Sequence, residues 1–168
     1  MTHSADHFFD WLRDAHAMEV QAIGLLRNQI GRIESYPDLK QRLQRHLAET
    51  EAQEQALKAL LDRTPQGNSM LKDMTSRLTA VAQVVGTLFS AAEVVKASMT
   101  AYTFEHTEIA TYRVLIAAAD ELGDQEARQV FEQILTQEIA MADWLEAHID
   151  TVTRLYLMRD ERNLQARR

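Results

Sequence analysis

The chain has no cysteine among its 168 residues, which excludes disulfide bonds, thiolate metal ligands and cysteine-based catalysis. Glycine and proline are scarce, with five and two residues, and aromatic residues make up only 7% of the chain. Strand-like alternation is rare, whereas Ala, Leu, Glu, Gln and Arg are abundant. Because these five residue types favour helices, the composition predicts an all-α protein.

Long apolar runs and an excess of positive charge are absent as well. No stretch approaches the roughly 18 apolar residues of a membrane span, and no N-terminal segment joins a basic start to an apolar run. The net charge of −7 argues against general nucleic-acid binding, which depends on neutralising phosphates with Lys and Arg. We therefore expect a soluble, cytoplasmic protein that binds neither membranes nor nucleic acid.

Apolar residues recur at helical spacing in four long segments. We predict helices over residues 4–34, 37–63, 90–122 and 124 to the low 150s. Pro37 suits a first helical turn, and Gly123 suits the position just after a helix end. Short turns then join the helices into two hairpins, which predicts a single domain over 1–168 built as an antiparallel four-helix bundle.

The segments outside the two hairpins differ from each other in composition. With hairpins over 4–63 and 90–155, residues 64–89 form a crossover that is too apolar for a simple linker, and its helical spacing predicts a shorter helix within it. Residues 156–168 are locally basic, but they also carry Asp160 and Glu161. We interpret them as a solvated tail.

Each of the four long helices carries glutamate where its inward face should be apolar. Helix three has two such residues, and each of the others has one: Glu105 and Glu108, then Glu19, Glu49 and Glu138. Glu19 and Glu49 are separated by 30 residues, as are Glu108 and Glu138. In antiparallel hairpins of similar length, equal separations place both members of each pair at a similar depth.

Buried glutamates require compensation, because each buried ion costs several kcal/mol unless it is paired. Raised pKa values could keep some of them protonated, but divalent cations would neutralise most of the charge and use the carboxylates as ligands. We therefore favour a metal site formed by Glu19, Glu49, Glu105, Glu108 and Glu138. Further candidate ligands are Gln53, His46 and His16, although each histidine is equally well interpreted as a satisfied core residue.

Four segments of the chain together resemble the YciE/YciF-type branch of the ferritin-like superfamily, whose members are often labelled stress-related and ferroxidase-like. They are LRDAHAMEVQA (12–22), HLAETEAQ (46–53), FEHTEIATYRVLIAAA (104–119) and LTQEIAMADWLEAHI (135–149). The resemblance implies a ferritin-like bundle with a long crossover between its second and third helices. It also implies a carboxylate-bridged centre that holds two divalent metal ions, with iron or manganese expected.

The superfamily pattern has one Glu from each of two helices and Glu-x-x-His from the other two. By resemblance, Glu49 and Glu138 take the Glu positions of the Glu-x-x-His motifs, and Glu19 and the Glu105/Glu108 pair take the single-Glu positions. The chain departs from the pattern because Ala52 and Met141 stand where the two histidines are expected. An oxygen-dominated site of this kind suits hard cations.

Two functional hypotheses remain open from the sequence. The first is a dinuclear iron or manganese protein with ferroxidase or peroxide-handling activity in the stress response. The second is a non-enzymatic helical scaffold or stress protein whose metal site is structural or vestigial; it is favoured by the apolar segment 71–89 and by the aromatic residues Phe8, Phe9, Trp11 and Trp144. We expect a homodimer under both hypotheses.

Overall fold

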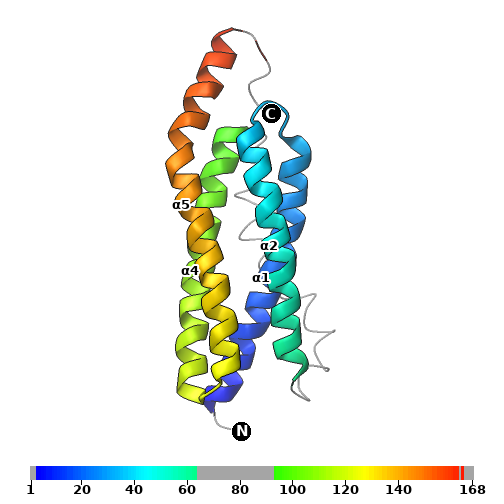
Figure 1. Cartoon of the computed structure of the whole chain (residues 1–168), viewed down its shortest axis with the longest axis vertical. Coiled ribbons are helices and arrows are strands. Elements are labelled where there is room, and N and C mark those ends of the chain that lie inside the picture. The colour runs from blue at the N-terminus through cyan, green and yellow to red at the C-terminus, as the bar shows by residue number, and fades with distance from the viewer. Residues whose placement is uncertain (1–2, 64–92, 163, 165–168) are drawn as a thin grey trace.

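A computed structural model describes residues 3–162 except 64–92, together with residue 164. The described chain forms four helices, α1 (His3–Arg32), α2 (Pro37–Asp62), α4 (Val94–Leu122) and α5 (Gln125–Glu161), which lie side by side as a bundle (Figure 1). The predicted all-α four-helix bundle is confirmed. No helix in this part of the chain is long and apolar enough to cross a membrane.

Neighbouring helices of the bundle run in opposite directions. The helix α1 contacts α2 and α4, and α5 contacts α4 and α2. In Figure 1, α1 and α5 run upward while α2 and α4 run downward, so α2 ends and α4 begins at opposite ends of the bundle. The crossover that we predict over residues 64–89, with its short helix, lies outside the described residues.

The ends of the helices follow from local chemistry. Pro37 occupies the first turn of α2. Backbone N–H groups in a first turn have no acceptor within the helix, so a proline there costs no hydrogen bond. Gly123 ends α4 with a φ of 70°, a left-handed conformation that costs glycine little. The Asp124 side chain then accepts a hydrogen bond from the backbone N–H of Ala127 at 3.0 Å, and Arg63 pairs with the same carboxylate at 2.7 Å. The start of α5 is thereby tied to the end of α2.

The last helix continues past the end that we predicted for it. Residues 156–161, which we assigned to a solvated tail, are the final turns of α5. Val152 is buried, and Leu155 and Tyr156 pack against the core beside it. Arg159 also donates a hydrogen bond to the Ser35 hydroxyl at 2.9 Å, so the extension is held against the turn between α1 and α2.

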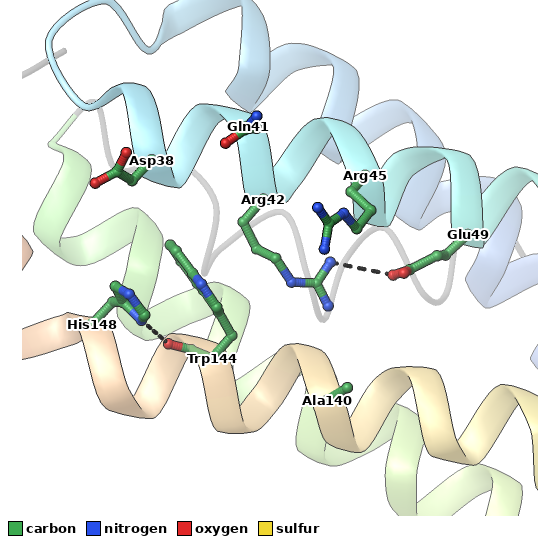
Figure 2. A pocket seen from close by; sticks show the side chains of 8 residues that line it. All are labelled: Asp38, Gln41, Arg42, Arg45, Glu49, Ala140, Trp144 and His148. Carbon is green, nitrogen blue, oxygen red and sulfur yellow. Dashed lines mark hydrogen bonds and ion pairs between the residues drawn. The ribbon is translucent and has the colours of Figure 1, made fainter.

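Two apolar clusters form the core of the bundle. Phe8, Leu57, Leu115 and Phe131 belong to one cluster. The other contains Leu26, Leu43, Ala101 and Leu145, among others. Along α2, the buried residues between Leu43 and Leu57 are His46, Thr50 and Gln53, so a polar layer crosses the core. On the outside of the bundle, α2 and α5 also border a pocket of about 530 Å³ (Figure 2).

Candidate metal centre

Four glutamates are buried in the polar layer. Glu19 from α1, Glu105 and Glu108 from α4, and Glu138 from α5 are each at most 3% exposed. Their burial follows from helical periodicity, because each lies on the same stripe as apolar core residues of its own helix. Three helices therefore bring carboxylates into one layer of the bundle interior.

The tightest group in this layer combines three of these carboxylates with an imidazole. Each of His46, Glu105, Glu108 and Glu138 offers one ligand atom, and these four atoms all lie within 4.8 Å of one another. We call these four residues the buried cluster. Because imidazole nitrogen and carboxylate oxygen are common metal ligands, the buried cluster can hold a metal ion.

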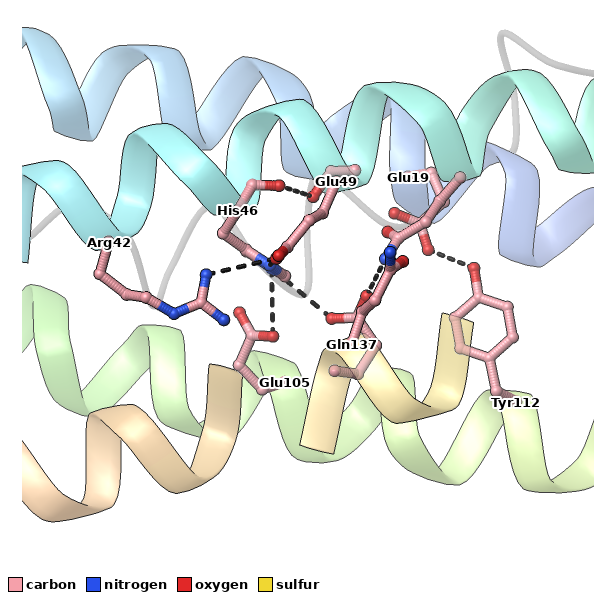
Figure 3. Close-up of polar contacts among 10 residues, drawn as sticks. Glu19, Arg42, His46, Glu49, Glu105, Tyr112 and Gln137 are labelled. Atoms are coloured by element: carbon pink, nitrogen blue, oxygen red, sulfur yellow. Dashed lines mark hydrogen bonds and ion pairs between the residues drawn. The ribbon is translucent and has the colours of Figure 1, made fainter. Parts of the chain in front are cut away.

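His46 is the cation at the centre of these contacts. Its Nε2 lies 3.2 Å from Glu105 Oε2 and 3.5 Å from Glu138 Oε2, while Nδ1 lies 3.1 Å from Glu49 Oε2 (Figure 3). Burial alone would lower the His46 pKa, but the charges and hydrogen bonds of these carboxylates outweigh it and raise the pKa to about 10. Without a metal, the imidazolium form of His46 compensates part of the buried negative charge.

Glu19 lies at the other end of the layer from His46 and Glu105, beside Tyr112 (Figure 3). The buried hydroxyl of Tyr112 donates a hydrogen bond to Glu19 Oε1. Burial raises the Glu19 pKa from 4.5 to about 7, although this hydrogen bond acts in the opposite direction. Burial and the adjacent Glu19 charge raise the Tyr112 pKa well above 10, so the phenol keeps its proton.

Burial also raises the pKa values of Glu108 and Glu138 well above 4.5, and repulsion from neighbouring carboxylates adds to the effect, whereas the charge of His46 lowers the pKa of Glu138. Gln53 donates to Glu138 Oε1 at 2.5 Å and to Gln137 at 2.9 Å. The Oε2 atoms of Glu19, Glu108 and Glu138 have no hydrogen-bond partner among the described residues, so buried oxygens remain available as ligands.

The structure places Glu49 at the edge of the layer rather than inside it. Its side chain is 24% exposed and bonds to Arg42 at 3.2 Å as well as to His46. The hydrogen bond from His46 lowers the Glu49 pKa, and Arg42 adds to the effect. Position 49 is turned about 60° around the helix from position 46, so the inward position on α2 belongs to the histidine. The sequence signal for His46 was its place on the buried stripe with Leu43 and Thr50.

His16, the remaining candidate, points elsewhere. It is buried, but its Nε2 lies 2.7 Å from Glu54 Oε1, and it does not belong to the buried cluster. Among the ligands predicted from sequence, the structure thus brings together Glu105, Glu108, Glu138 and His46. Glu19 and Gln53 adjoin them, whereas Glu49 lies at the rim and His16 pairs separately.

The donor set of the buried cluster fits a metal ion. Beside it lies a cavity of about 10 Å³, which His46, Glu105 and Glu108 line together with apolar residues such as Ala22 and Phe104. One nitrogen ligand with several carboxylates suits iron, manganese or another divalent cation of similar hardness. A bound cation would also favour the ionised form of the buried carboxyls, whose pKa values are raised in its absence.

A four-helix bundle with a carboxylate and histidine cluster in its interior defines a class of helical proteins that can hold metal. The family model described as Domain of unknown function (DUF892) matches residues 3–158, and the chain belongs to this family. The match covers α1, α2 and α4 in full and α5 as far as residue 158.

Three solved structures are similar to this chain. A protein from Xanthomonas campestris pv. campestris is 34% identical, with a TM-score of 0.75, over 94% of this chain and 99% of that one. The Escherichia coli stress protein YciF shares the fold at 20% identity and a TM-score of 0.71, over 89% of this chain and 96% of YciF. YcfI from Rhodopseudomonas palustris, provisionally described as a structural protein, is 25% identical with a TM-score of 0.64, over 87% of this chain and 94% of YcfI.

Proposed function

We propose that this protein is a ferritin-like metal-binding protein that holds two divalent ions, iron or manganese, in its polar layer. The observation that carries the proposal is the buried cluster, in which His46 and three glutamates present ligand atoms within 4.8 Å of one another. So many buried carboxyls are costly for folding alone, and metal binding accounts for them.

The ligands that we propose are His46, Glu105, Glu108 and Glu138, with Glu19 completing the second half of the site. The charges of both Glu138 and Glu19 raise the pKa of Glu108, which supports a place for the Glu108 carboxylate near both halves of the site. Glu49 is not a ligand in this proposal. It contacts His46 Nδ1 from the edge of the polar layer. This contact fixes which imidazole nitrogen is presented to the metal.

The neighbouring residues keep the ligands in place. Gln53 bonds to one oxygen of Glu138, and the other has no hydrogen-bond partner among the described residues; Tyr112 and the two oxygens of Glu19 are arranged in the same way. To hold a metal ion, His46 would be neutral with a free lone pair on Nε2 and the carboxyls would be ionised, so metal binding would favour the deprotonated forms of these ligands. Iron or manganese would supply one-electron redox chemistry with oxygen or peroxide, so the reaction that we propose is ferroxidase or peroxide-handling activity.

The resemblance to YciE/YciF-type proteins supports a cytoplasmic role in the stress response, since YciF is described as a stress protein. We propose that the protein acts as a homodimer. One observation favours a second function, a structural protein without turnover: His46 already compensates buried carboxylates in the absence of metal, and YcfI has a provisional structural description.

Elemental analysis tests the proposed function. The protein is produced in medium supplemented with iron or manganese, purified without chelators and compared with Glu138→Gln and Glu146→Gln variants. Glu146 is exposed on the same helix and serves as the matched control. We expect up to two ions per chain in the parent and in the Glu146 variant, with a large loss in the Glu138 variant. Metal content near zero in the parent contradicts the proposal.

Fe(II) oxidation by the same samples separates the two functions. The redox function predicts that oxygen or peroxide is consumed with multiple turnovers by the parent and not by the Glu138→Gln variant. A parent that binds metal tightly without oxidising Fe(II) supports the structural function instead.

A further inference from the structure

The pocket between α2 and α5 is a second candidate binding site, separate from the buried cluster. It has a volume of about 530 Å³, which lies within the range of small-molecule sites. Asp38, Gln41, Arg42, Arg45 and Glu49 line it from α2, and Ala140, Trp144 and His148 line it from α5. The metal ligands that we propose do not line it.

Two arginines point into this pocket from adjacent turns of α2 (Figure 2). The Arg42 side chain is only 10% exposed, and its ion pair with Glu49 is formed through a single nitrogen at 3.2 Å. Arg45 makes no ion pair within 4.0 Å with the residues that the structure describes. Because Glu49 also accepts a hydrogen bond from His46, one carboxylate serves two cationic groups while Arg45 stands beside them. This wall of the pocket therefore carries uncompensated positive charge.

The opposite wall is aromatic. Trp144 and His148 stack with their ring centroids 3.8 Å apart and their planes 12° from parallel. His148 Nδ1 also bonds to the Trp144 carbonyl oxygen at 2.7 Å, which fixes the imidazole on the indole. Asp38 is the remaining acid of the pocket, and it lies at the end away from Glu49 (Figure 2). The pocket thus presents guanidinium groups at one end and a flat apolar surface beside them.

We propose that this pocket binds a small aromatic or apolar carboxylate. The carboxylate pairs with Arg42 and Arg45, because guanidinium groups bind carboxylates through paired N–H donors. The apolar part of the ligand lies against Trp144 and Ala140. Asp38 repels a second negative charge at the far end of the pocket, so a ligand with a single charged group fits best.

Tryptophan fluorescence of the metal-free full chain tests this proposal, with benzoate as the probe. Trp11 lies on α1, outside the pocket, so a Trp11→Phe background leaves Trp144 as the single reporter. Benzoate is titrated at constant ionic strength, and benzamide serves as an uncharged probe of the same shape. We expect a saturable change in Trp144 fluorescence with benzoate and at least about tenfold weaker binding of benzamide.

Arginine variants in the same background locate the site. Arg45→Gln removes no ion pair between described residues, so it should fold normally and bind benzoate about tenfold more weakly. Arg42→Gln should weaken benzoate binding further, and circular dichroism melting shows whether it still folds. The control is Arg154→Gln, which alters a 78% exposed arginine on α5 that pairs with Asp150. Absence of saturation, equal binding of both probes, or unchanged affinity in Arg45→Gln overturns the proposal.

Discussion

His46 Nε2 lies 3.2 Å from Glu105 Oε2, so an imidazole of α2 meets a carboxylate of α4 in the bundle interior. Both side chains are almost fully buried. A buried imidazolium and carboxylate neutralise each other without metal, whereas a neutral imidazole and the same carboxylate are a pair of metal ligands. The negative charge of this layer can thus be neutralised either by a proton on His46 or by a metal ion.

Replacing His46 with glutamine should weaken metal binding. The variant loses the only nitrogen donor of the buried cluster, and we expect Mn²⁺ affinity to fall by at least about tenfold. Isothermal titration of the chelator-treated protein measures this affinity. His106→Gln is the control, because His106 is exposed on α4 and its ring contacts Tyr102. Equal affinities of the His46 variant and the parent would exclude His46 as a ligand.

The stability of the metal-free protein should fall as pH rises. Folding raises the Glu19 pKa from 4.5 to about 7 and the His46 pKa from 6.5 to about 10. A group whose pKa is raised in the folded state stabilises that state fully below its unfolded pKa, and this contribution is lost as pH rises through the folded pKa. Urea denaturation should therefore give a larger free energy of unfolding near pH 5.5 than near pH 8.5.

A Glu19→Gln variant should show a smaller fall over this interval, because glutamine does not titrate. Saturating Mn²⁺ should oppose the fall, because deprotonated ligands bind the metal more tightly as pH rises. A metal-free parent whose stability rises between these two pH values would contradict the assignment of protonated carboxyls to the polar layer.

The hydroxyl of Tyr112 should contribute measurably to stability. Tyr112→Phe removes the hydrogen bond to Glu19 and leaves a buried carboxyl oxygen without its donor. We expect a loss of about 1–3 kcal/mol in the free energy of unfolding. The matched control is Tyr102→Phe, whose ring is only partly buried, and its change should stay within about 0.5 kcal/mol. Equal losses in the two variants would show that the Tyr112 hydroxyl has no particular role.

Asp124 should stabilise the joint between α2 and α5. Asp124→Ala removes the cap of α5 and the partner of Arg63, which should cost about 1–2 kcal/mol. Thermal melting measures the loss. Asp150→Ala is the control, because the ion pair of Asp150 with Arg154 lies on the surface, where solvent screens it and it contributes little to stability. A cap variant no less stable than this control would refute the role of Asp124.

Much of the fold follows from local sequence signals. Pro37 and Gly123 mark helix limits within a residue or two of those observed, and helical periodicity places Glu105 and Glu108 on the face that the structure buries. The end of α5 does not follow in this way, because Arg159 bonds to Ser35, which lies 124 residues earlier in the chain. A contact between such distant residues leaves no periodic signal beside either of them.

Within the site, the roles of His46 and Glu49 could not be predicted from local sequence either. The two positions lie on nearly the same side of α2, so spacing alone does not decide which one faces the interior. Contacts with neighbouring helices determine that His46 faces the interior, because Glu105 of α4 and Glu138 of α5 lie against its imidazole. Arg42 holds Glu49 at the rim. The resemblance to Glu-x-x-His motifs favoured the glutamate, whereas α2 carries the reverse order, His-x-x-Glu.

The most direct test of the proposed metal centre is anomalous X-ray diffraction from crystals grown with Mn²⁺, recorded at the manganese absorption edge. The proposed function predicts strong anomalous density in the polar layer, within coordinating distance of His46, Glu105, Glu108 and Glu138. Anomalous density confined to the protein surface, with none among these four side chains, would contradict it.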